Sequence, residues 1–340
     1  MTFSVSGNGF GTDMSGRPVK IAVIIPAYRV RAHILGVIRL IPSHVQGIYV
    51  VDDACPDGSG ALVREQCNDA RVRVLQNEQN QGVGGAVLAG YRDAIADGFD
   101  VLVKIDGDGQ MDPALIDRFV GPIAAGEADY TKGNRFYRLD EISVMPKARI
   151  LGNAVLSLMS KLSTGYWDVF DPTNGYTAVH AKVMELLPEK RLSKRYFFET
   201  DLLFRLGTIR AVVQDVPMRA VYGDEVSNLK IRKVVGEFLI KHLRNFAKRI
   251  FYKYYLRDMN AGTVQLTAGV VATAFGLLFG ASHWLQSIGN GVPTATGTVM
   301  LAALPTLLGA QFLLGFLGAD ITSVPKKALW PSLTTTRYRA

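Results

Sequence analysis

The sequence predicts an α/β domain with a mostly parallel sheet, followed by a basic amphipathic helix and a pair of membrane-spanning helices. Two observations support this fold class. In the first 230 residues, short apolar runs rich in β-branched residues alternate with segments of helical periodicity. That pattern is typical of a parallel sheet with helices on both faces. From residue 259 to residue 319, the chain contains no Asp, Glu, Lys or Arg.

The strands and helices of the domain are expected in strict alternation. Four apolar runs are expected to contain strands: 19–28, 48–60, 71–77 and 100–110. Three periodic segments between them are expected to form helices: 32–40, 60–67 and 84–96. In such sheets ligands bind beyond the carboxyl ends of the strands. Because Asp52, Asp53 and the group from Asp106 to Gln110 are expected at the carboxyl ends of two of these strands, we expect them to converge on one crevice.

The composition narrows the classes of function. The net charge of +8 suits nucleic acid, an anionic membrane surface or a phosphorylated ligand. Cys55 and Cys67 form no CxxC motif or Cys/His cluster, so we expect reduced thiols, with one disulfide between them as the alternative. Residues 1–18 are rich in Gly, Ser and Thr and lack the apolar stretch of a signal peptide, so we expect a flexible tail. Residues 19–229 are expected to form the α/β domain.

The region 259–320, which carries no charged residue before Asp320, predicts a transmembrane hairpin. Its two apolar stretches, about 262–282 and 296–319, are each long enough to cross a bilayer, which takes about 20 residues. The turn-forming segment SIGNGVP separates them and predicts a short loop. The alternative is a pair of buried helices in a soluble core. It is disfavoured because soluble helices usually keep a charged face.

The segment 230–258 predicts a helix that lies at a membrane surface. It contains nine Lys and Arg residues but only two acids, Glu237 and Asp258. Its apolar residues recur at helical spacing, and four basic residues fall largely on the other sides: Lys241, Arg244, Lys248 and Arg249. A solvated basic helix is the plainer alternative. Nucleic acid is disfavoured as a partner because the basic segment runs directly into an apolar span.

The distribution of basic residues also predicts an orientation. Lys and Arg precede the hairpin, Lys326 and Lys327 follow it, and the loop between its spans has none. By the positive-inside rule both ends face the cytoplasm. We therefore expect a multi-pass protein of the inner (cell) membrane, with a cytoplasmic α/β domain and a cytoplasmic tail over residues 321–340.

The stretch IDGDGQ offers oxygen ligands at alternate positions. Asp106, Asp108 and Gln110 present carboxylate and amide oxygens, which hard cations such as Mg²⁺ and Mn²⁺ prefer. A metal there could bridge to a diphosphate and neutralise charge on a leaving group. The alternative is a turn or helix cap built from Asp and Gly.

The glycine-rich stretch NQGVGGAVLAG does not fit a dinucleotide-binding fingerprint. The third glycine of G-x-G-x-x-G falls on Val87, and no acidic partner has a clear spacing. A phosphate near the start of the helix that follows remains a hypothesis.

Several motifs occur in the order of a known family. VIIPAY, VVDDACPDG, NQGVGGA, KIDGDGQMDP, KGNRF and DPTNGY resemble those of the family 2 glycosyltransferases, which have the GT-A fold. The Asp-x-Asp-x-Gln form, the Asp171 motif and the C-terminal hairpin resemble the polyprenol-phosphate branch, which includes dolichol-phosphate mannose synthases and bacterial polyprenyl-phosphate glucosyltransferases. The resemblance covers about residues 19–230 by motif and 231–320 by architecture. It implies a GT-A domain, a nucleotide-sugar donor, a polyprenyl phosphate acceptor and a divalent metal.

The resemblance implies roles for individual residues on the donor side. The nucleotide-sugar-binding positions are Pro26, Tyr28, Asp53, Gly82, Asp106 and Lys132. The metal ligands are Asp106, Asp108 and Gln110, with Mg²⁺ or Mn²⁺ as the cofactor. Two positions depart from the family pattern. Arg29 follows Tyr28 where the family often has Asn-Glu, and Thr177 stands where an arginine is often found.

The resemblance also implies the catalytic and acceptor residues. Asp171 is implied near the reacting sugar, and Arg135 at the diphosphate or the acceptor phosphate. Glu199 and Asp201 match an acidic position beside the acceptor. A matched mobile loop adds three acceptor-phosphate candidates: Ser227, Lys230 and Arg232.

Plainer roles stay open for several of these residues. They are a surface ion pair for Arg135, capping of a helix that starts at Thr200 for Glu199 and Asp201, and turn chemistry for Asp171 and Ser227.

These implications together predict an inverting glycosyltransferase. The expected donor is a UDP- or GDP-hexose, and the expected acceptor is undecaprenyl or dolichyl phosphate in the membrane. A phosphate monoester has its second pKa at about 6, so the nucleophile needs no strong base. Asp171 is then expected to orient the sugar rather than to accept a proton.

Other functions stay open on the sequence alone. Transfer to a hydroxyl of another membrane lipid would need a base, for which Glu199 or Asp201 are candidates. A non-catalytic membrane scaffold that binds nucleotide sugar is disfavoured by the intact Asp108, Gln110 and Asp171. A processive polysaccharide synthase is disfavoured because no tryptophan follows an arginine, as its Gln-x-x-Arg-Trp motif requires. Homo-oligomer formation is left open.

Overall fold

The chain folds into two compact units. The computed structural model describes residue 12 and residues 16–137, 147–219 and 231–335, but not the side chains of 147–149, 231–235 and 335. The first unit contains Met1–Asn245 together with Pro325–Ala340, and the second is Phe246–Val324. The second unit is therefore inserted into the sequence of the first, an arrangement that the sequence analysis did not predict.

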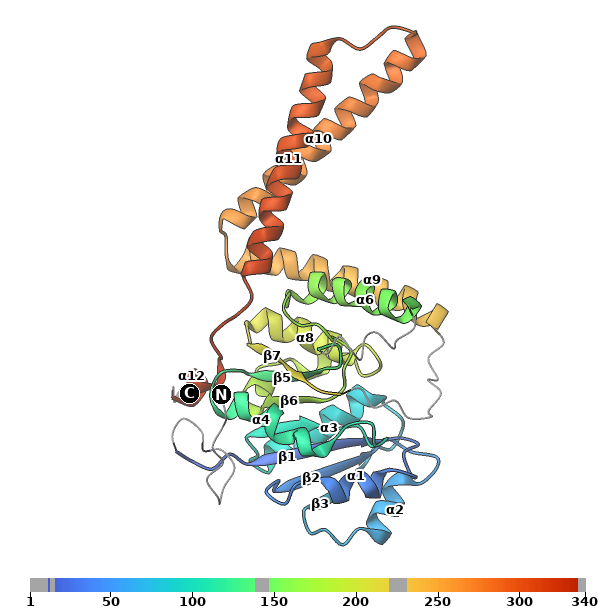
Figure 1. Ribbon diagram of the computed structural model, residues 1–340, viewed down its shortest axis with the longest axis vertical. Helices are drawn as coiled ribbons and strands as arrows, with labels where there is room; N and C mark the ends of the chain where they lie inside the picture. The colour runs from blue at the N-terminus through green and yellow to red at the C-terminus, as the bar shows by residue number, and fades with distance from the viewer. Residues whose placement is uncertain (1–11, 13–15, 138–146, 220–230, 336–340) are drawn as a thin grey trace. The chain divides into compact units, whose positions relative to one another are not determined.

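The first unit is built on a seven-stranded sheet with the order β3-β2-β1-β4-β6-β5-β7 (Figure 1). The strands are β1 (Ile21–Ala27), β2 (Gly47–Asp52), β3 (Val72–Gln76), β4 (Val101–Lys104), β5 (Tyr130–Asn134), β6 (Thr177–His180) and β7 (Val213–Pro217). All pairs are parallel except those of β6, which runs antiparallel to β4 and β5. The predicted mixed, mostly parallel sheet is confirmed.

Helices alternate with these strands. In the first unit they are α1 (Ile34–Leu40), α2 (Ser59–Gln66), α3 (Val83–Ala96), α4 (Ile116–Ala124), α6 (Lys147–Thr164), α7 (Ala181–Glu185), α8 (Phe198–Ile209) and α12 (Trp330–Thr335), with 3₁₀ turns η1 (Pro113–Leu115) and η2 (Glu189–Arg191). Helix α9 (Ile231–Ile250) begins in this unit and ends in the second. Strands β1, β2 and β4 are buried along nearly their whole length, as expected for parallel strands covered on both faces.

The strand order reverses between β1 and β4. The chain moves outward from β1 to β2 and β3, and then returns to place β4 on the other side of β1. Because parallel crossovers are right-handed, this reversal puts α3 on the face opposite α1 and α2. It also opens a crevice beyond the carboxyl ends of β1 and β4, which is where such sheets bind ligands.

The second unit contains two long apolar helices. After the π-helical segment η3 (Phe251–Arg257), α10 (Ala261–Asn290) and α11 (Thr296–Thr322) lie side by side (Figure 1). Both are long and apolar enough to cross a membrane, and only 11% of the most apolar stretch of each is buried. Core helices of a soluble domain would be mostly buried. The predicted pair of apolar hairpin helices is confirmed.

Asp320, near the end of α11, gathers three partners from the segment before the hairpin. Its carboxylate accepts two hydrogen bonds from Arg249 (2.8 and 3.0 Å), one from Lys253 (3.0 Å) and one from the Tyr254 hydroxyl (2.7 Å). Arg249 is buried by this pairing. The expectation that Arg249 shares the exposed basic side of its helix with Arg244 is therefore wrong.

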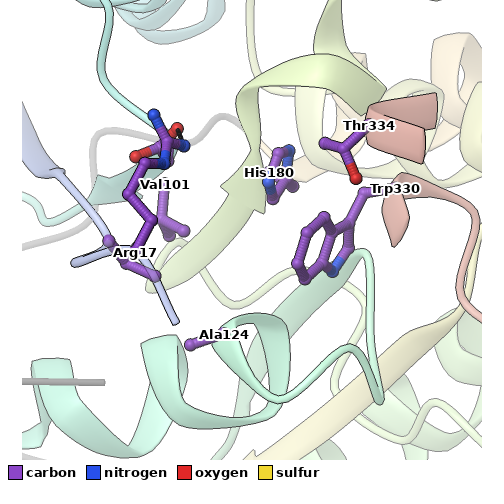
Figure 2. A pocket seen from close by; sticks show the side chains of 8 residues that line it. Arg17, Val101, Ala124, His180, Trp330 and Thr334 are labelled. Atoms are coloured by element: carbon purple, nitrogen blue, oxygen red, sulfur yellow. Dashed lines mark hydrogen bonds and ion pairs between the residues drawn. The ribbon is translucent and has the colours of Figure 1, made fainter. Parts of the chain in front are cut away.

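The chain after the hairpin returns to the first unit and docks there. The buried carboxylate of Asp129 accepts hydrogen bonds from the amides of Leu329 (2.8 and 2.9 Å) and Trp330 (2.9 Å), and from that of Val212 (2.8 Å). The Trp330 ring stacks on His180 with 4.4 Å between ring centres (Figure 2). A small pocket beside this contact is lined by Arg17, Val19, Asp100, Val101, Ala124, His180, Trp330 and Thr334. It lies toward the amino end of β4, away from the crevice.

Candidate active site

The carboxyl ends of β1 and β2 carry the first predicted donor-binding residues. Pro26 lies in β1 beside Val51 of β2, and Tyr28 follows the strand with 42% of its surface exposed. Arg29 has a φ of +60°, and Ala54, in the neighbouring loop, has a φ of +52°. Each such conformation costs a non-glycine residue on the order of 1–3 kcal/mol and is typical of ligand-binding edges. The Tyr28 ring is thus exposed to solvent at the carboxyl edge of the sheet, next to two residues with a strained backbone.

The Asp53 side chain is hydrogen-bonded to the loop that precedes α3. Its buried carboxylate accepts hydrogen bonds from the Asn77 side chain (2.7 Å) and from the amides of Gln81 (2.9 Å) and Gly82 (2.8 Å). Gly82 has a φ of +85°, and a side chain there would collide with the Lys194 carbonyl. Asp53 and Gly82 therefore shape the loop that enters α3. The amides expected to receive a phosphate at this glycine-rich start are bonded to Asp53 instead.

The loop after β4 brings the predicted metal ligands together. Asp106, Asp108 and Gln110 are all partly buried. The Asp108 carboxylate accepts a hydrogen bond from the backbone N–H of Gln110 (2.9 Å). Among the residues that the structure describes, no group of three or more His, Cys, Asp or Glu is placed to hold a metal ion. Two carboxylates and one amide oxygen nevertheless fit Mg²⁺ or Mn²⁺, because such ions commonly keep waters and phosphate oxygens as further ligands. The loop therefore suits a metal ion that is bound together with a diphosphate.

A buried lysine lies directly beneath this loop. Lys104 ends β4, is 1% exposed, and places its ammonium 2.8 Å from Asp106 Oδ1 and 3.4 Å from Glu199 Oε1. It also donates to the Gly175 carbonyl (3.1 Å). Burial alone would lower the pKa of Lys104, but the carboxylates of Asp106 and Glu199 outweigh burial and raise that pKa. Lys104 is not among the site residues predicted from the sequence. Its signal was a lysine inside an apolar strand, which is rare unless the charge is paired.

A second buried lysine, Lys132, lies in β5. Its ammonium donates to the Asn174 carbonyl, and its side chain is completely buried. Burial lowers the pKa of Lys132 to about 8, although the nearby carboxylates of Glu199 and Asp171 oppose that effect. Lys132 is therefore placed to act on a bound ligand through its charge rather than through direct contact.

Asp171 and Arg135 form an ion pair with each other. The Arg135 Nε donates to Asp171 Oδ2 (2.8 Å), and a second guanidinium nitrogen donates to Oδ1 (3.1 Å). The Asp171 side chain is 1% exposed, whereas that of Arg135 is 32% exposed. The buried carboxylate is thus placed to orient the guanidinium, and two parallel hydrogen bonds fix its plane.

Asp215 also belongs to this region and was missed by the sequence analysis. Asp215 lies opposite Lys132 in the register of strands β5 and β7. Its carboxylate accepts hydrogen bonds from the Asn134 side chain (2.9 Å) and from the backbone amide of Phe170 (3.0 Å). Burial raises the pKa of Asp215 to about 6. Because Phe170 precedes Asp171, Asp215 helps to hold the Asp171 loop against the sheet. A single aspartate in a short strand belongs to no motif, so the sequence offered no signal for it.

Glu199 and Asp201 point to different surroundings. Helix α8 begins at Phe198 rather than at Thr200, and both acids lie in its first turn. Glu199 faces Lys104, as described above. The Asp201 carboxylate instead accepts a hydrogen bond from the backbone amide of Ser193 (2.9 Å). This bond fixes the segment that precedes α8. The structure therefore brings Glu199, and not Asp201, to the charged cluster.

The predicted acceptor-phosphate loop cannot be placed. Ser227 and Lys230 lie outside the described residues, as does the side chain of Arg232 in the first turn of α9.

The resulting site has two layers. At the carboxyl edge of the sheet, Tyr28, Asp108 and Arg135 offer an aromatic ring, a metal-binding oxygen and a cation, none of them fully buried. Beneath them lies a mostly buried set of alternating charges: Lys104, Asp106, Lys132, Asp171, Glu199 and Asp215. A ligand with a flat base, a metal-bound diphosphate and a second anionic group would match the upper layer.

Comparison with known proteins identifies a family of enzymes. The family model described as Glycosyl transferase family 2 matches residues 22–187. A UDP-N-acetylglucosamine–dolichyl-phosphate N-acetylglucosaminyltransferase of Methanococcus voltae is 30% identical over 216 residues, which are 59% of this chain and 86% of that protein. A polyprenol monophosphomannose synthase of Mycolicibacterium smegmatis is 33% identical over 202 residues, 58% of this chain and 75% of that protein. A solved glucosyl-3-phosphoglycerate synthase of Mycobacterium tuberculosis gives a TM-score of 0.47 at 20% identity, covering 68% of this chain and 80% of that one.

The fold and these relatives define the protein as an enzyme, a glycosyltransferase. The chain belongs to glycosyl transferase family 2, in the branch whose members include polyprenol-phosphate sugar transferases.

Proposed function

We propose that this glycosyltransferase transfers a hexose from a UDP- or GDP-sugar to a polyprenyl monophosphate, such as undecaprenyl or dolichyl phosphate, with inversion at the anomeric carbon. The observation that carries the proposal is the presence, in one chain, of the Asp106–Asp108 oxygen pair and of two long apolar helices. The oxygen pair suits a metal-bound nucleoside diphosphate, and the helices suit an acceptor that stays in the bilayer. The names of the relatives, which include dolichyl and polyprenol phosphates, support the same acceptor class.

The donor binds at the carboxyl edge of the sheet. Tyr28 packs against the base, while Asp106 and Asp108, with Gln110, hold Mg²⁺ or Mn²⁺. When bound, the metal neutralises the charge that develops on the leaving diphosphate. Lys132 adds positive charge from below, and because its pKa is about 8 it carries that charge at neutral pH.

The acceptor phosphate attacks without a strong protein base. Its second pKa of about 6 leaves it mostly ionised at neutral pH. Asp171 is too well paired to serve as a free base, since Arg135 occupies both of its carboxylate oxygens. Asp171 instead holds Arg135 toward the phosphate groups, where a planar guanidinium binds well.

The surface of the first unit supports an acceptor in a membrane. Helix α6 carries no charged residue from 150 to 160, and the Ser163 hydroxyl of α6 hydrogen-bonds His242 of α9 (2.8 Å). Large apolar side chains stay exposed on these two helices: Leu151, Val155, Leu158, Leu239, Ile240 and Leu243. The exposed basic residues Arg244 and Lys248 accompany them on α9. Apolar residues with basic neighbours are typical of helices that lie on an anionic membrane surface.

The proposed location follows from the same features. The basic residues on both sides of the hairpin favour a cytoplasmic catalytic domain at the inner membrane, with both spans of the hairpin crossing the bilayer.

Transfer to a lipid hydroxyl is the second candidate function. It would require a general base, and Glu199 is the acid nearest the charged cluster. Its pairing with Lys104 disfavours that role, because proton uptake by Glu199 would leave a buried ammonium with one partner fewer.

The proposal is tested by incubating the purified protein in detergent with a panel of radiolabelled UDP- and GDP-sugars and undecaprenyl phosphate, with Mg²⁺, Mn²⁺ or EDTA. We expect one donor to give a lipid product that mild acid cleaves and that EDTA abolishes. Undecaprenol in place of undecaprenyl phosphate is the matched acceptor control. Product from undecaprenol alone would favour the lipid-hydroxyl function. Nucleotide binding without product from either lipid would favour the non-catalytic scaffold.

A further inference from the structure

The buried ammonium of Lys104 connects two acids that lie far apart in the sequence. It lies 2.8 Å from Asp106 Oδ1, at the candidate metal loop, and 3.4 Å from Glu199 Oε1, in the first turn of α8. Its third contact is the Gly175 carbonyl, just before β6. One cation therefore contacts three segments: the loop after β4, the loop before β6 and the first turn of α8.

The packing around this cation is tight. A side chain on Gly175 would come within 2.6 Å of both Lys104 Nζ and Asp106 Oδ2. The backbone thus closes over the ion pair, and the Lys104 side chain is only 1% exposed. Lys104 cannot touch a substrate in this arrangement, and Asp106 is the candidate metal ligand that it contacts directly.

Glu199 is the second partner of the same ammonium, and its side chain is only 12% exposed. A lysine held by one carboxylate could still swing toward or away from it. Two carboxylates and a carbonyl on different sides fix the ammonium in place. Glu199 thereby restrains Lys104, and Lys104 restrains one oxygen of Asp106.

We propose that Lys104 and Glu199 form a positioning pair that fixes the Asp106 carboxylate for the metal-bound diphosphate, with Glu199 acting only through Lys104. Neither residue contacts the donor. The inference rests on the proposed function, because it assigns Asp106 to the metal–nucleotide site. It gives Glu199 a role different from both a general base and a helix cap.

A purely stabilising role makes a different prediction. A buried ion pair is weak evidence for stability, and its replacement by neutral residues of similar size is often neutral or stabilising. If the pair serves only the fold, its neutral replacement will retain nucleotide binding. If it positions Asp106, binding will fall even when the protein remains as stable as before.

The experiment measures binding of UDP and GDP to the full-length protein by calorimetry, with Mn²⁺ and with EDTA, for Lys104→Met, Glu199→Gln and the double variant. Groups that hold a metal ligand in place typically contribute about 10–100-fold to affinity. We expect Lys104→Met to weaken Mn²⁺-dependent binding roughly tenfold or more, and Glu199→Gln to weaken it less. We expect the double variant to match Lys104→Met, because Glu199 meets the residues of the metal loop through Lys104.

The outcomes are distinct. A double variant whose loss equals the product of the two single losses would overturn the inference, as would wild-type affinity in Lys104→Met. Thermal unfolding of each variant is recorded alongside. Lys104→Met leaves the buried Glu199 carboxylate without its lysine, and the double variant neutralises that carboxylate, so it keeps the test valid if Lys104→Met unfolds. The pair Lys182→Met and Glu185→Gln, an exposed ion pair on α7, is the control for the same substitutions and is expected to bind as wild type. Wild-type protein that binds neither nucleotide with Mn²⁺ would instead overturn the proposed function, and this inference with it.

Discussion

At the scale of single residues, the direction of the Arg135 guanidinium depends on one buried carboxylate. Asp171 holds two of its nitrogens, and the Asn174 side chain donates a third hydrogen bond to the same carboxylate (3.3 Å). The pair turns a flexible arginine into a fixed cation at the edge of the sheet. Catalysis by such a group depends on its placement more than on its charge alone.

We expect Asp171→Asn to lower turnover roughly 100-fold, because a small displacement of a positioned group costs about that much. Nucleotide affinity should fall less than turnover, since Asp171 acts through Arg135. Turnover and nucleotide binding are measured on the same preparation. Full recovery of turnover at alkaline pH, or with an added nucleophile, would show that Asp171 acts as a base instead.

Asp215 predicts a pH dependence of stability. Burial raises its folded-state pKa from 3.8 to about 6, so the folded state binds the proton more tightly than the unfolded state does. Its contribution therefore lowers stability as the pH rises from about 4 to 6, and the full cost is present above that range. We expect Asp215→Asn to remove this part of the pH dependence.

The measurement is the thermal unfolding midpoint of wild type and Asp215→Asn at several values between pH 4 and 7. The variant should gain stability relative to wild type as the pH rises. A constant difference across this range would contradict the assignment.

Residue identity predicted the location of some site residues but not their partners. Asp106 and Asp108 were placed correctly at a strand end because the apolar run before them predicts β4. The hydrogen bonds of Asp53 come from a loop some 25 residues later, and the Asp201 carboxylate is bonded to the segment before its own helix. Such pairings depend on tertiary packing, which no local pattern encodes.

At the scale of elements, the C-terminal segment acts as a second attachment of the hairpin unit to the catalytic unit. Helix α9 is the first connection, and the chain from Pro325 onward is the other. The second connection is anchored by the Asp129 carboxylate and by the buried Trp330 ring. Loss of a buried tryptophan side chain typically costs about 3–5 kcal/mol.

We expect Trp330→Ala to release this segment while leaving the sheet folded. Lys326 and Lys327 lie just before the anchor, so release should make the chain there more sensitive to trypsin. The measurement is the rate of trypsin cleavage, followed by mass spectrometry of the full-length protein in detergent. An unchanged rate would mean that the Asp129 contacts alone hold the segment.

The elements themselves were largely predictable from the sequence. Alternation of apolar and periodic runs gave β1–β4 and α1–α3 to within a few residues at most ends, and the uncharged stretches gave α10 and α11. The burial of Arg249 was not predictable, because its partner Asp320 lies 71 residues further along the chain. The docking of Trp330 on His180 was missed for the same reason.

At the scale of the whole molecule, the account requires the catalytic domain to work at a charged membrane surface. Arg244 and Lys248 are exposed on α9, and each basic residue near an anionic surface contributes about 1 kcal/mol. Arg249 is excluded from this set because Asp320 binds it.

We expect Arg244→Gln with Lys248→Gln to reduce transfer to the lipid acceptor more than hydrolysis of the nucleotide sugar. The difference should be larger in nanodiscs containing phosphatidylglycerol than in purely zwitterionic ones, because the attraction is electrostatic. Both activities are compared in both membranes. Equal losses of transfer and hydrolysis would indicate a folding defect rather than a membrane effect.

The proposed nucleophile is a lipid phosphate, and the linkage in the product distinguishes it from a lipid hydroxyl. After incubation of the enzyme with its donor, Mn²⁺ and undecaprenyl phosphate, the lipid fraction is examined by ³¹P NMR and mass spectrometry. The account predicts a single phosphodiester that carries one hexose and is cleaved by mild acid to undecaprenyl phosphate. A product in which the phosphate remains a monoester, with the hexose attached to another lipid through a hydroxyl, would contradict it.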